Sequence, residues 1–244
     1  MLGHTRGIVL RKVKYGDSGL IVTVLTVDLG VRSFLVRGMK AGTKTGARAG
    51  AFQHGMQLEI GYFDSGQKTM LRLTEFQLLR VYMSLTEDVI KNTVLMFASE
   101  LLLRLLPENA PMPAIFDSAT RFLDDLDAVP TAGVGNFPLF FAMTCGRLLG
   151  YEFSGAFSED TPYPDLSDGG FSSHPPAEGN LMNFTEAQAL SALLASRRVT
   201  DLQYISLPGH TRNKLLDWYL VFLERHTQHM GSMRSLPVLR ALLA

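Results

Sequence analysis

The chain has a single cysteine, Cys145, among its 244 residues. One cysteine excludes an intramolecular disulfide framework and is typical of a reducing compartment, so we expect a cytoplasmic protein. Cys145 ends the apolar run Phe140–Cys145. This setting favours a small buried hydrophobic side chain over a nucleophile.

Long apolar runs are also missing. The nearest one, around Leu101–Leu106, is interrupted by Arg104, whereas a membrane-spanning helix needs about 18 or more apolar residues. Met1–Arg6 lacks the apolar core and small-residue cleavage site of a signal peptide. We therefore expect neither a membrane span nor a leader. The 46% apolar content still allows a substantial core, in one large domain or two smaller ones.

Catalytic patterns are not recognisable. No G-x-S-x-G elbow occurs, and no paired carboxylates stand in a catalytic frame. Gly38–Thr45 is similar to a phosphate-binding loop, but Thr43 replaces a required glycine and Gly46–Gly50 lacks a helical apolar period. His226 and His229 have the spacing of two metal ligands without a nearby third. We expect no enzyme, no cofactor and no metal.

The net charge of zero hides an uneven distribution. The first 80 residues contain 12 Lys and Arg against 5 Asp and Glu, and the remaining 164 contain 11 against 18. The front therefore carries a net charge of +7 and the back −7. This pattern predicts a polyanion-binding part joined to a scaffold or partner-binding part.

Residues 5–81 show the β-branched enrichment and the Gly and Asp breaks of short strands joined by turns. The predicted strands are Gly7–Val13, Leu20–Thr26, Val31–Arg37, Gln57–Phe63 and Thr69–Arg80. Five strands in about 75 residues favour a small antiparallel barrel, for which the OB-fold is the candidate.

Beyond Tyr82 the apolar spacing becomes helical. Ser84–Glu87 has the pattern of a capping box, which we expect to open a helix over Val89–Leu106. Further helices are predicted over Ala114–Val129, Phe137–Leu149, from Thr185 onward, Thr211–Met230 and Leu236–Leu243. For the helix over Phe137–Leu149, Asn136 is the expected N-cap and Gly150 the expected stop. Asp124, Asp125 and Asp127 are interpreted as a solvated helix face.

The predicted fold class is α+β. A five-stranded OB-fold domain, which we expect to bind nucleic acid, occupies residues 1–81, and a helical-bundle domain occupies residues 82–244. Residues at about 151–183 are rich in Gly, Pro, Ser and Asp, and form an irregular insertion with a loop and a short hairpin.

The basic residues of the front form the candidate phosphate-binding set, which consists of Arg11, Lys12, Lys14, Arg32, Arg37, Lys40, Lys44, Arg48, Lys68 and Arg72. The best candidates are Arg37, Lys40, Lys44 and Arg48. They recur every three to four residues in a glycine-rich stretch that lacks carboxylates. Arg11, Lys14 and Arg32 rank behind them, and a solvated charged face is the alternative.

Aromatic side chains could stack on bases. The candidates are Tyr15, Phe34, Phe52, Tyr62 and Phe63. Tyr15 is preferred because it stands in a turn, whereas Phe34 is assigned to the core.

Several short motifs follow one another in a familiar order. They are Gly7–Leu10, Tyr15–Ile21, Leu25–Gly30 and Phe34–Gly38, and then, after a basic loop, Ala51–Gln53. Leu148–Tyr151 and Met233–Leu239 agree at lower specificity. In this order the chain resembles the RecO family of bacterial DNA repair proteins, which are recombination mediators.

The resemblance implies an OB-fold, a helical C-terminal domain, binding of single- and double-stranded DNA, and annealing of complementary strands without covalent chemistry. The implied partners are RecR and the single-stranded DNA-binding protein, whose hold on DNA is relaxed so that the recombinase can load. Many members hold a structural zinc with four cysteines, but Tyr151–Phe171 contains none. We therefore expect no zinc here, and packing of Tyr163, Leu166 and Phe171 in its place.

Acidic, hydrophobic-ended peptide tails bind apolar pockets rimmed with Arg or Lys. The candidate rim residues in the helical part are Arg104, Arg121 and Arg147. Two alternative functions stay open. One is a non-enzymatic scaffold whose basic barrel binds an acidic protein partner, and the other is an enzyme of unknown chemistry in the helical domain.

Overall fold

The computed structural model describes residues 1–17, 19–37, 48–66, 70–177, 181–227 and 230–243. The chain forms two compact units, Met1–Ala128 and Val129–Ala244. The first unit therefore includes a stretch of helices as well as the strands. Whether residues 1–81 and 82–244 act as separate domains stays a prediction.

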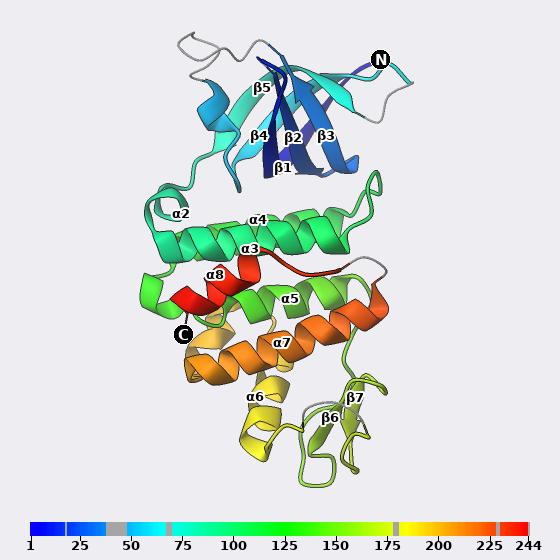
Figure 1. Ribbon diagram of the computed structural model, residues 1–244, viewed down its shortest axis with the longest axis vertical. Coiled ribbons are helices and arrows are strands. Elements are labelled where there is room, and N and C mark those ends of the chain that lie inside the picture. The colour runs from blue at the N-terminus through cyan, green and yellow to red at the C-terminus, as the bar shows by residue number, and fades with distance from the viewer. Residues whose placement is uncertain (18, 38–47, 67–69, 178–180, 228–229, 244) are drawn as a thin grey trace. The chain divides into compact units, whose positions relative to one another are not determined.

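The first unit contains a closed five-stranded barrel (Figure 1). Its strands are β1 (Leu2–Tyr15), β2 (Gly19–Thr26), β3 (Gly30–Val36), β4 (Gln57–Phe63) and β5 (Leu71–Arg80). They follow the order β1-β2-β3-β5-β4, and β4 pairs with β1 to complete the circle. All pairs are antiparallel except that of β3 with β5. The barrel confirms the predicted OB-fold.

Alternating side chains of these strands fill the barrel, because successive strand residues point to opposite faces. The buried cluster consists of Val9, Val22, Val24, Phe34, Val36, Phe52, Met56, Leu58, Ile60 and Leu71. Full burial of such a side chain contributes roughly 1.5–3 kcal/mol. Phe52 and Met56 come from the segment that follows the 3₁₀ helix η1 (Arg48–Ala51). This segment is held to β1 by two backbone hydrogen bonds: Val9 N–H donates to the carbonyl of Met56, and Gly55 N–H donates to the carbonyl of Val9.

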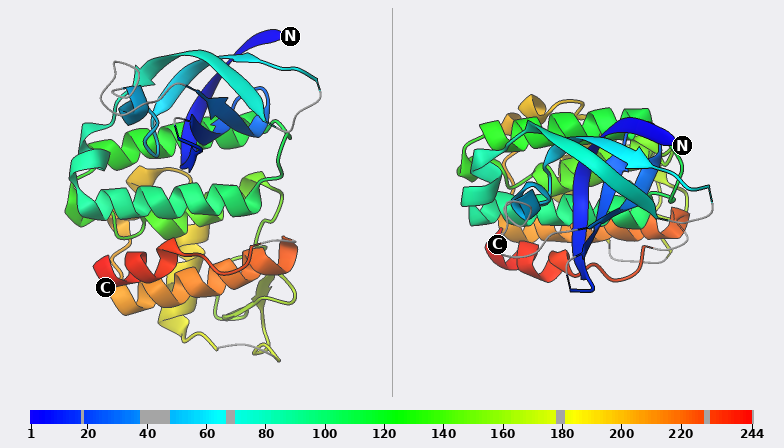
Figure 2. Two further views of the ribbon diagram at one scale, coloured as in Figure 1. Left: turned by 45° about the horizontal axis from the view of Figure 1, so that its top comes forward. Right: turned by 90° about the horizontal axis from the view of Figure 1, so that it is seen from above.

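Three helices complete the first unit, namely α2 (Met83–Glu87), α3 (Val89–Leu105) and α4 (Pro113–Ala128). Helices α3 and α4 lie side by side (Figure 2). The expected capping box at Ser84–Glu87 is wrong, because those residues belong to α2. The chain is extended at Asp88, whose carboxylate accepts hydrogen bonds from the backbone N–H groups of Ile90 and Lys91 and so caps α3.

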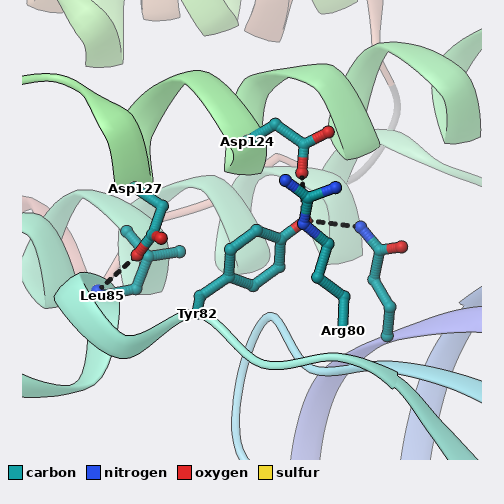
Figure 3. Close-up of polar contacts among 6 residues, drawn as sticks. Arg80, Tyr82, Leu85, Asp124 and Asp127 are labelled. Atoms are coloured by element: carbon teal, nitrogen blue, oxygen red, sulfur yellow. Dashed lines mark hydrogen bonds and ion pairs between the residues drawn. The ribbon is translucent and has the colours of Figure 1, made fainter.

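Polar contacts join β4, α2 and α4 around the buried Tyr82 (Figure 3). Its hydroxyl donates to Asp124 Oδ1 at 2.7 Å and accepts from Gln57 Nε2 at 2.6 Å. Burial and the Asp124 carboxylate raise the pKa of Tyr82, so the hydroxyl keeps its proton. Asp124 also pairs with Arg80 at 3.1 Å.

Asp127, one turn along α4, accepts from the backbone N–H of Leu85 at 3.1 Å. The interpretation of this acidic run as a solvated face is therefore wrong for Asp124 and Asp127. Asp125 points elsewhere and is exposed. The two carboxylates face α2 because the chain folds back over α4, which the local sequence does not reveal.

The turn at Gly30 lies against the segment that follows α3. Gly30 has a φ of +70°, and a Cβ atom there would overlap the backbone of Ala110. In the same region the backbone N–H of Asn109 donates to the carbonyl of Val31 at 3.2 Å. The close approach of these two backbones requires glycine at position 30.

The second unit holds the remaining helices and a hairpin. Its elements are η2 (Thr131–Gly133), α5 (Phe137–Leu148), β6 (Tyr163–Asp165), β7 (Gly170–Ser172), α6 (Phe184–Ala195), η3 (Val199–Tyr204), α7 (Gly209–His226) and α8 (Ser235–Leu242). The hairpin in the irregular insertion is confirmed, as is the stop of α5 at Gly150, which has a φ of +85°.

One predicted helix start, one predicted cap and one predicted helix end in this unit need correction. Asn183, not Thr185, opens α6, and it exchanges capping hydrogen bonds with Glu186. Asn136 stands at the start of α5, but its side chain does not cap the helix; its amide donates to the carbonyl of Ile205 at 2.7 Å. Helix α7 ends at His226, before the predicted Met230.

Aromatic packing anchors the hairpin. The Phe153 ring lies 5.5 Å from Phe171, 5.3 Å from Trp218 and 5.5 Å from Phe222, in edge-on arrangements. Such pairs contribute about 0.5–1.5 kcal/mol beyond their burial. Leu166 is buried and Tyr163 contacts Phe184, so the expected packing of the insertion is confirmed. Its central ring, Phe153, was not predicted.

None of the helices that the structure describes is both long enough and apolar enough to cross a bilayer.

Replacing Gly30 by alanine should lower the free energy of unfolding by roughly 3 kcal/mol or more. A positive φ costs about 1–2 kcal/mol for an L-residue, and the clash with Ala110 adds to it. Gly66 is the matched control, since it has a φ of +72° and open space around it. Urea unfolding of both variants measures the difference, and equal losses would contradict the close packing at Gly30.

The pair of Glu186 with Lys214 should make the stability of the second unit depend on pH. Burial raises the pKa of Glu186, but the hydrogen bonds from Lys214 and the Asn183 backbone outweigh it and lower the pKa overall. The ionised carboxylate therefore stabilises the fold above its ordinary pKa of about 4.3, and this is lost as pH falls through the lowered folded value. The advantage of the wild type over Glu186→Gln should be full near neutral pH and shrink in acid, in chemical denaturation followed by circular dichroism. A constant difference would contradict this assignment.

Candidate nucleic-acid interface

Side chains on neighbouring strands form a continuous row on the outside of the barrel. The row follows the paired positions of β1, β2, β3, β5 and β4, and consists of Val13, Ile21, Leu35, Arg72 and Phe63. We call these five residues the outer row. Adjacent strands lie about 4.8 Å apart, so the row extends for about 19 Å around the barrel.

The outward direction of the row follows from the core. Three row residues have a core residue next to them in sequence: Ile21 is followed by Val22, Leu35 is preceded by Phe34, and Arg72 is preceded by Leu71. None of these three core residues is more than 1% exposed. Because successive side chains alternate, their neighbours point away from the core. Val13 is 41% exposed and Phe63 is 42% exposed. The row is thus an apolar stripe that contains one exposed cation, Arg72.

Three further exposed side chains flank the row on the same face. Arg11 and Tyr15 stand two residues before and after Val13 on β1, and Arg37 stands two residues after Leu35. No ion pair between residues described in the structure involves Arg11, Arg37 or Arg72. The structure therefore places the predicted Arg11, Tyr15 and Arg37 on one surface with Arg72, another member of the candidate phosphate-binding set.

Lys14 lies on the other side of β1 from Arg11 and Tyr15, because it is paired with Leu20 and alternates with both. Lys12 shares that side. Burial and the nearby charge of Lys12 lower the pKa of His54. These lysines are exposed, so the cations of β1 divide between two surfaces.

Arg32 is separated from the outer row. It pairs with the core position Val24, is only partly exposed, and its guanidinium donates to Asn109 Oδ1. The side chain thus ties β3 to the segment before α4. Its expected role in phosphate binding stays a prediction.

Several predicted residues lie outside the described part of the chain. They are Lys40, Lys44 and Lys68, together with Gly38–Thr45, the stretch compared with a phosphate-binding loop. Arg48 begins η1. Its role and those of the lysines stay predictions.

The aromatic candidates divide clearly by exposure. Tyr15 is 51% exposed, whereas Phe34 and Phe52 are completely buried. Phe52 packs against Phe76 at 4.6 Å, and Tyr62 meets the edge of Phe34 at 6.1 Å. The assignment of Phe34 to the core is confirmed. Phe63 is exposed to a similar extent as Tyr15 and is therefore a second possible stacking platform. The sequence did not show this, because the direction of the Phe63 side chain depends on how β4 pairs with its neighbours.

The described residues contain no group of three or more His, Cys, Asp and Glu side chains that could hold a metal ion. Burial raises the pKa of Cys145 to about 12, so its thiol is protonated and shielded, as expected for a core residue. The Nδ1 atom of His226 lies 2.8 Å from the carbonyl oxygen of Phe222. Its predicted companion, His229, is outside the described residues.

The candidate partner-binding arginines lie on three helices. Arg104 of α3 pairs with Glu100 at 3.4 Å, and Arg121 of α4 is exposed. Arg147 of α5 lines a small open pocket in the second unit with Met143, Tyr151, Glu152, Phe153, Leu194 and Tyr219. Burial and the positive charge of Arg197 lower the pKa of Arg147. The lining thus combines apolar side chains with the half-buried Arg147 guanidinium and the Glu152 carboxylate.

Comparison with known proteins matches both parts of the chain. The family described as "Recombination protein O N terminal" matches residues 1–82, and "Recombination protein O C terminal" matches residues 86–236. A DNA repair protein RecO from Christiangramia forsetii is 31% identical over 98% of both chains. Proteins of the same name from Phocaeicola vulgatus and Flavobacterium psychrophilum are 27% and 26% identical, over 100% and 97% of both chains.

Proposed function

The chain belongs to the recombination protein O family, and from this membership we propose that it is a non-enzymatic recombination mediator in DNA repair. In this role it binds single- and double-stranded DNA, promotes annealing of complementary strands, and helps to load the recombinase onto DNA covered by single-stranded DNA-binding protein. RecR is the second protein partner. Residues 1–81 provide the DNA-binding domain and residues 82–244 the helical domain.

One observation carries the DNA-binding part of the proposal, namely the exposed cations on the outer face of the barrel. Arg11, Arg37 and Arg72 flank or join the outer row without ion pairs among the described residues. A phosphate backbone binds to such cations through counterion release, without sequence readout. The glycine-rich stretch after Arg37 supplies Lys40 and Lys44 nearby in sequence.

The pocket at Arg147 supports binding of an acidic, hydrophobic-ended peptide tail, as the single-stranded DNA-binding protein would present. Leu194, which is partly exposed, offers apolar surface to the end of such a tail. The Arg147 guanidinium lies close enough to the carbonyl of Ser196, at 3.5 Å, to be oriented beside the pocket. Glu152 pairs with Arg197 at 3.7 Å, which reduces the negative charge at the pocket.

The alternative is a scaffold whose barrel binds an acidic protein surface. The same cations would serve it. An acidic protein partner would in addition have to cover the exposed apolar side chains Val13 and Phe63 with apolar groups of its own.

The protein should bind a fluorescent single-stranded oligonucleotide tightly at low salt and much more weakly at moderate salt. Changing Arg37, Lys40, Lys44 and Arg48 together to Glu should abolish this binding, measured by fluorescence anisotropy, while thermal unfolding stays nearly unchanged. Arg225→Glu is the control, because this arginine of α7 is exposed and its side chain donates a hydrogen bond to Ser167 in the second unit. Retained binding by the quadruple variant would reject these phosphate contacts. No binding by the wild type at low salt would favour the scaffold.

Arg147→Ala should weaken binding of a peptide that ends in acidic residues followed by an apolar C-terminal residue by roughly 10- to 150-fold, because charged hydrogen bonds contribute about 1.5–3 kcal/mol. Isothermal titration calorimetry measures the loss. DNA affinity should stay unchanged, since Arg147 belongs to the second unit. Arg198→Ala, an exposed arginine outside the pocket lining, is the matched control. Equal effects of both substitutions would show that only net charge matters.

A further inference from the structure

We infer that the outer row is the site for unpaired bases, so that it binds single-stranded DNA and contributes little to duplex binding. This inference rests on the proposed DNA binding and assigns one DNA form to one surface. Phe63 and Tyr15 are its stacking platforms, and Arg11, Arg37 and Arg72 are the cations that hold the backbone.

The composition of the surface carries the inference. A site for duplex DNA needs cations for phosphates, but the faces of the bases are stacked inside the helix and cannot meet apolar side chains. The outer row places four apolar side chains beside Arg72 and close in sequence to the flanking Arg11 and Arg37. Unpaired bases expose flat apolar faces that stack on aromatic rings, while their phosphates stay anionic. A single strand matches both properties of the row, whereas a duplex matches only its cations.

The arrangement of the row also suits a strand. Phe63 is paired with Arg72 across β4 and β5, so a ring and a guanidinium stand side by side. At the other end Val13 lies between Arg11 and Tyr15 on β1, with each neighbour two residues away. An exposed ring is thus adjacent to a cation at the Phe63 end, and a ring and a cation lie on either side of Val13 at the other end of a path of about 19 Å. OB-folds bind about four or more nucleotides over such surfaces.

The five residues of the outer row include no carboxylate. Glu75, which is paired with Gly61 two residues before Phe63, is exposed beside one end of the row. Ile21 and Leu35 are partly buried and provide apolar surface between the two ends of the row. Bases lying on the row would shield apolar surface that is otherwise exposed to water, which favours binding in addition to the electrostatic contribution.

The test compares two DNA probes of equal length, a fluorescent oligothymidylate and a blunt hairpin duplex. Phe63→Ala should lower the affinity for the single strand roughly 5- to 100-fold, the range expected for losing one stacked base. The duplex affinity should change less than about twofold. Phe63→Trp should restore single-strand binding, whereas Phe63→Leu, which keeps apolar surface without a flat aromatic face, should restore it only in part.

Leu79→Ala is the matched control. Leu79 lies near the other end of β5 and is 44% exposed, almost the same as Phe63 at 42%. It should bind both probes like the wild type. Thermal unfolding of each variant shows whether the barrel is intact, and the Trp and Leu variants preserve the test should the Ala variant be unstable.

The possible results are distinguishable. Selective loss of single-strand binding, with rescue by Trp, supports the inference. Unchanged binding of both probes, or an equal loss on both, overturns it and leaves the proposed DNA binding intact. Failure of the wild type to bind either probe at low salt overturns the proposed function, and the inference with it.

Discussion

The parallel pairing of β3 with β5 decides which side chains of the first unit face outward. In the described residues it joins Phe34 to Leu71 and Leu35 to Arg72. Side chains alternate along a strand, so a register shift of one residue would exchange the two faces. The observed register buries Phe34 and Leu71 and leaves Leu35 and Arg72 outside. The outer row is continuous only because this pairing closes the barrel between its antiparallel strands.

Polar and backbone contacts then hold the helices of the first unit to the barrel. The Tyr82 hydroxyl joins Gln57 of β4 to Asp124 of α4, and Gly30 admits the backbone of Ala110. Arg32 is part of the same support through Asn109. The basic residues of the front therefore have two uses, since some stabilise the fold and others are exposed to a ligand. Net charge alone does not separate them.

The strands and most helices could be predicted from the sequence because local apolar spacing decides them. The five strands differ from prediction mainly at their ends. What could not be predicted depends on partners far away in the sequence. Asp124 meets Tyr82 across 42 positions and Arg32 meets Asn109 across 77. Likewise, the sequence identified Phe63 as a candidate for base stacking and Arg72 as a candidate for phosphate binding. That the two residues are adjacent follows only from the register of β4 with β5.

Helix starts show the same limit at short range. Ser84 and Thr185 fit capping patterns, yet Asp88 and Asn183 stand where the backbone actually turns into the helix. Several residues near a helix start can cap it equally well, and the neighbouring segments decide between them.

The ring cluster at Phe153 has a consequence for the conditions under which the second unit stays folded. A site of four thiolates depends on metal supply and on reduced sulfur, whereas contacts among Phe153, Phe171, Trp218 and Phe222 depend on neither. Chelators and oxidants of thiols therefore do not act on the anchorage of the hairpin. Temperature does, because apolar association weakens on cooling. The contacts that hold the hairpin therefore need neither a supply of zinc nor reduced thiols.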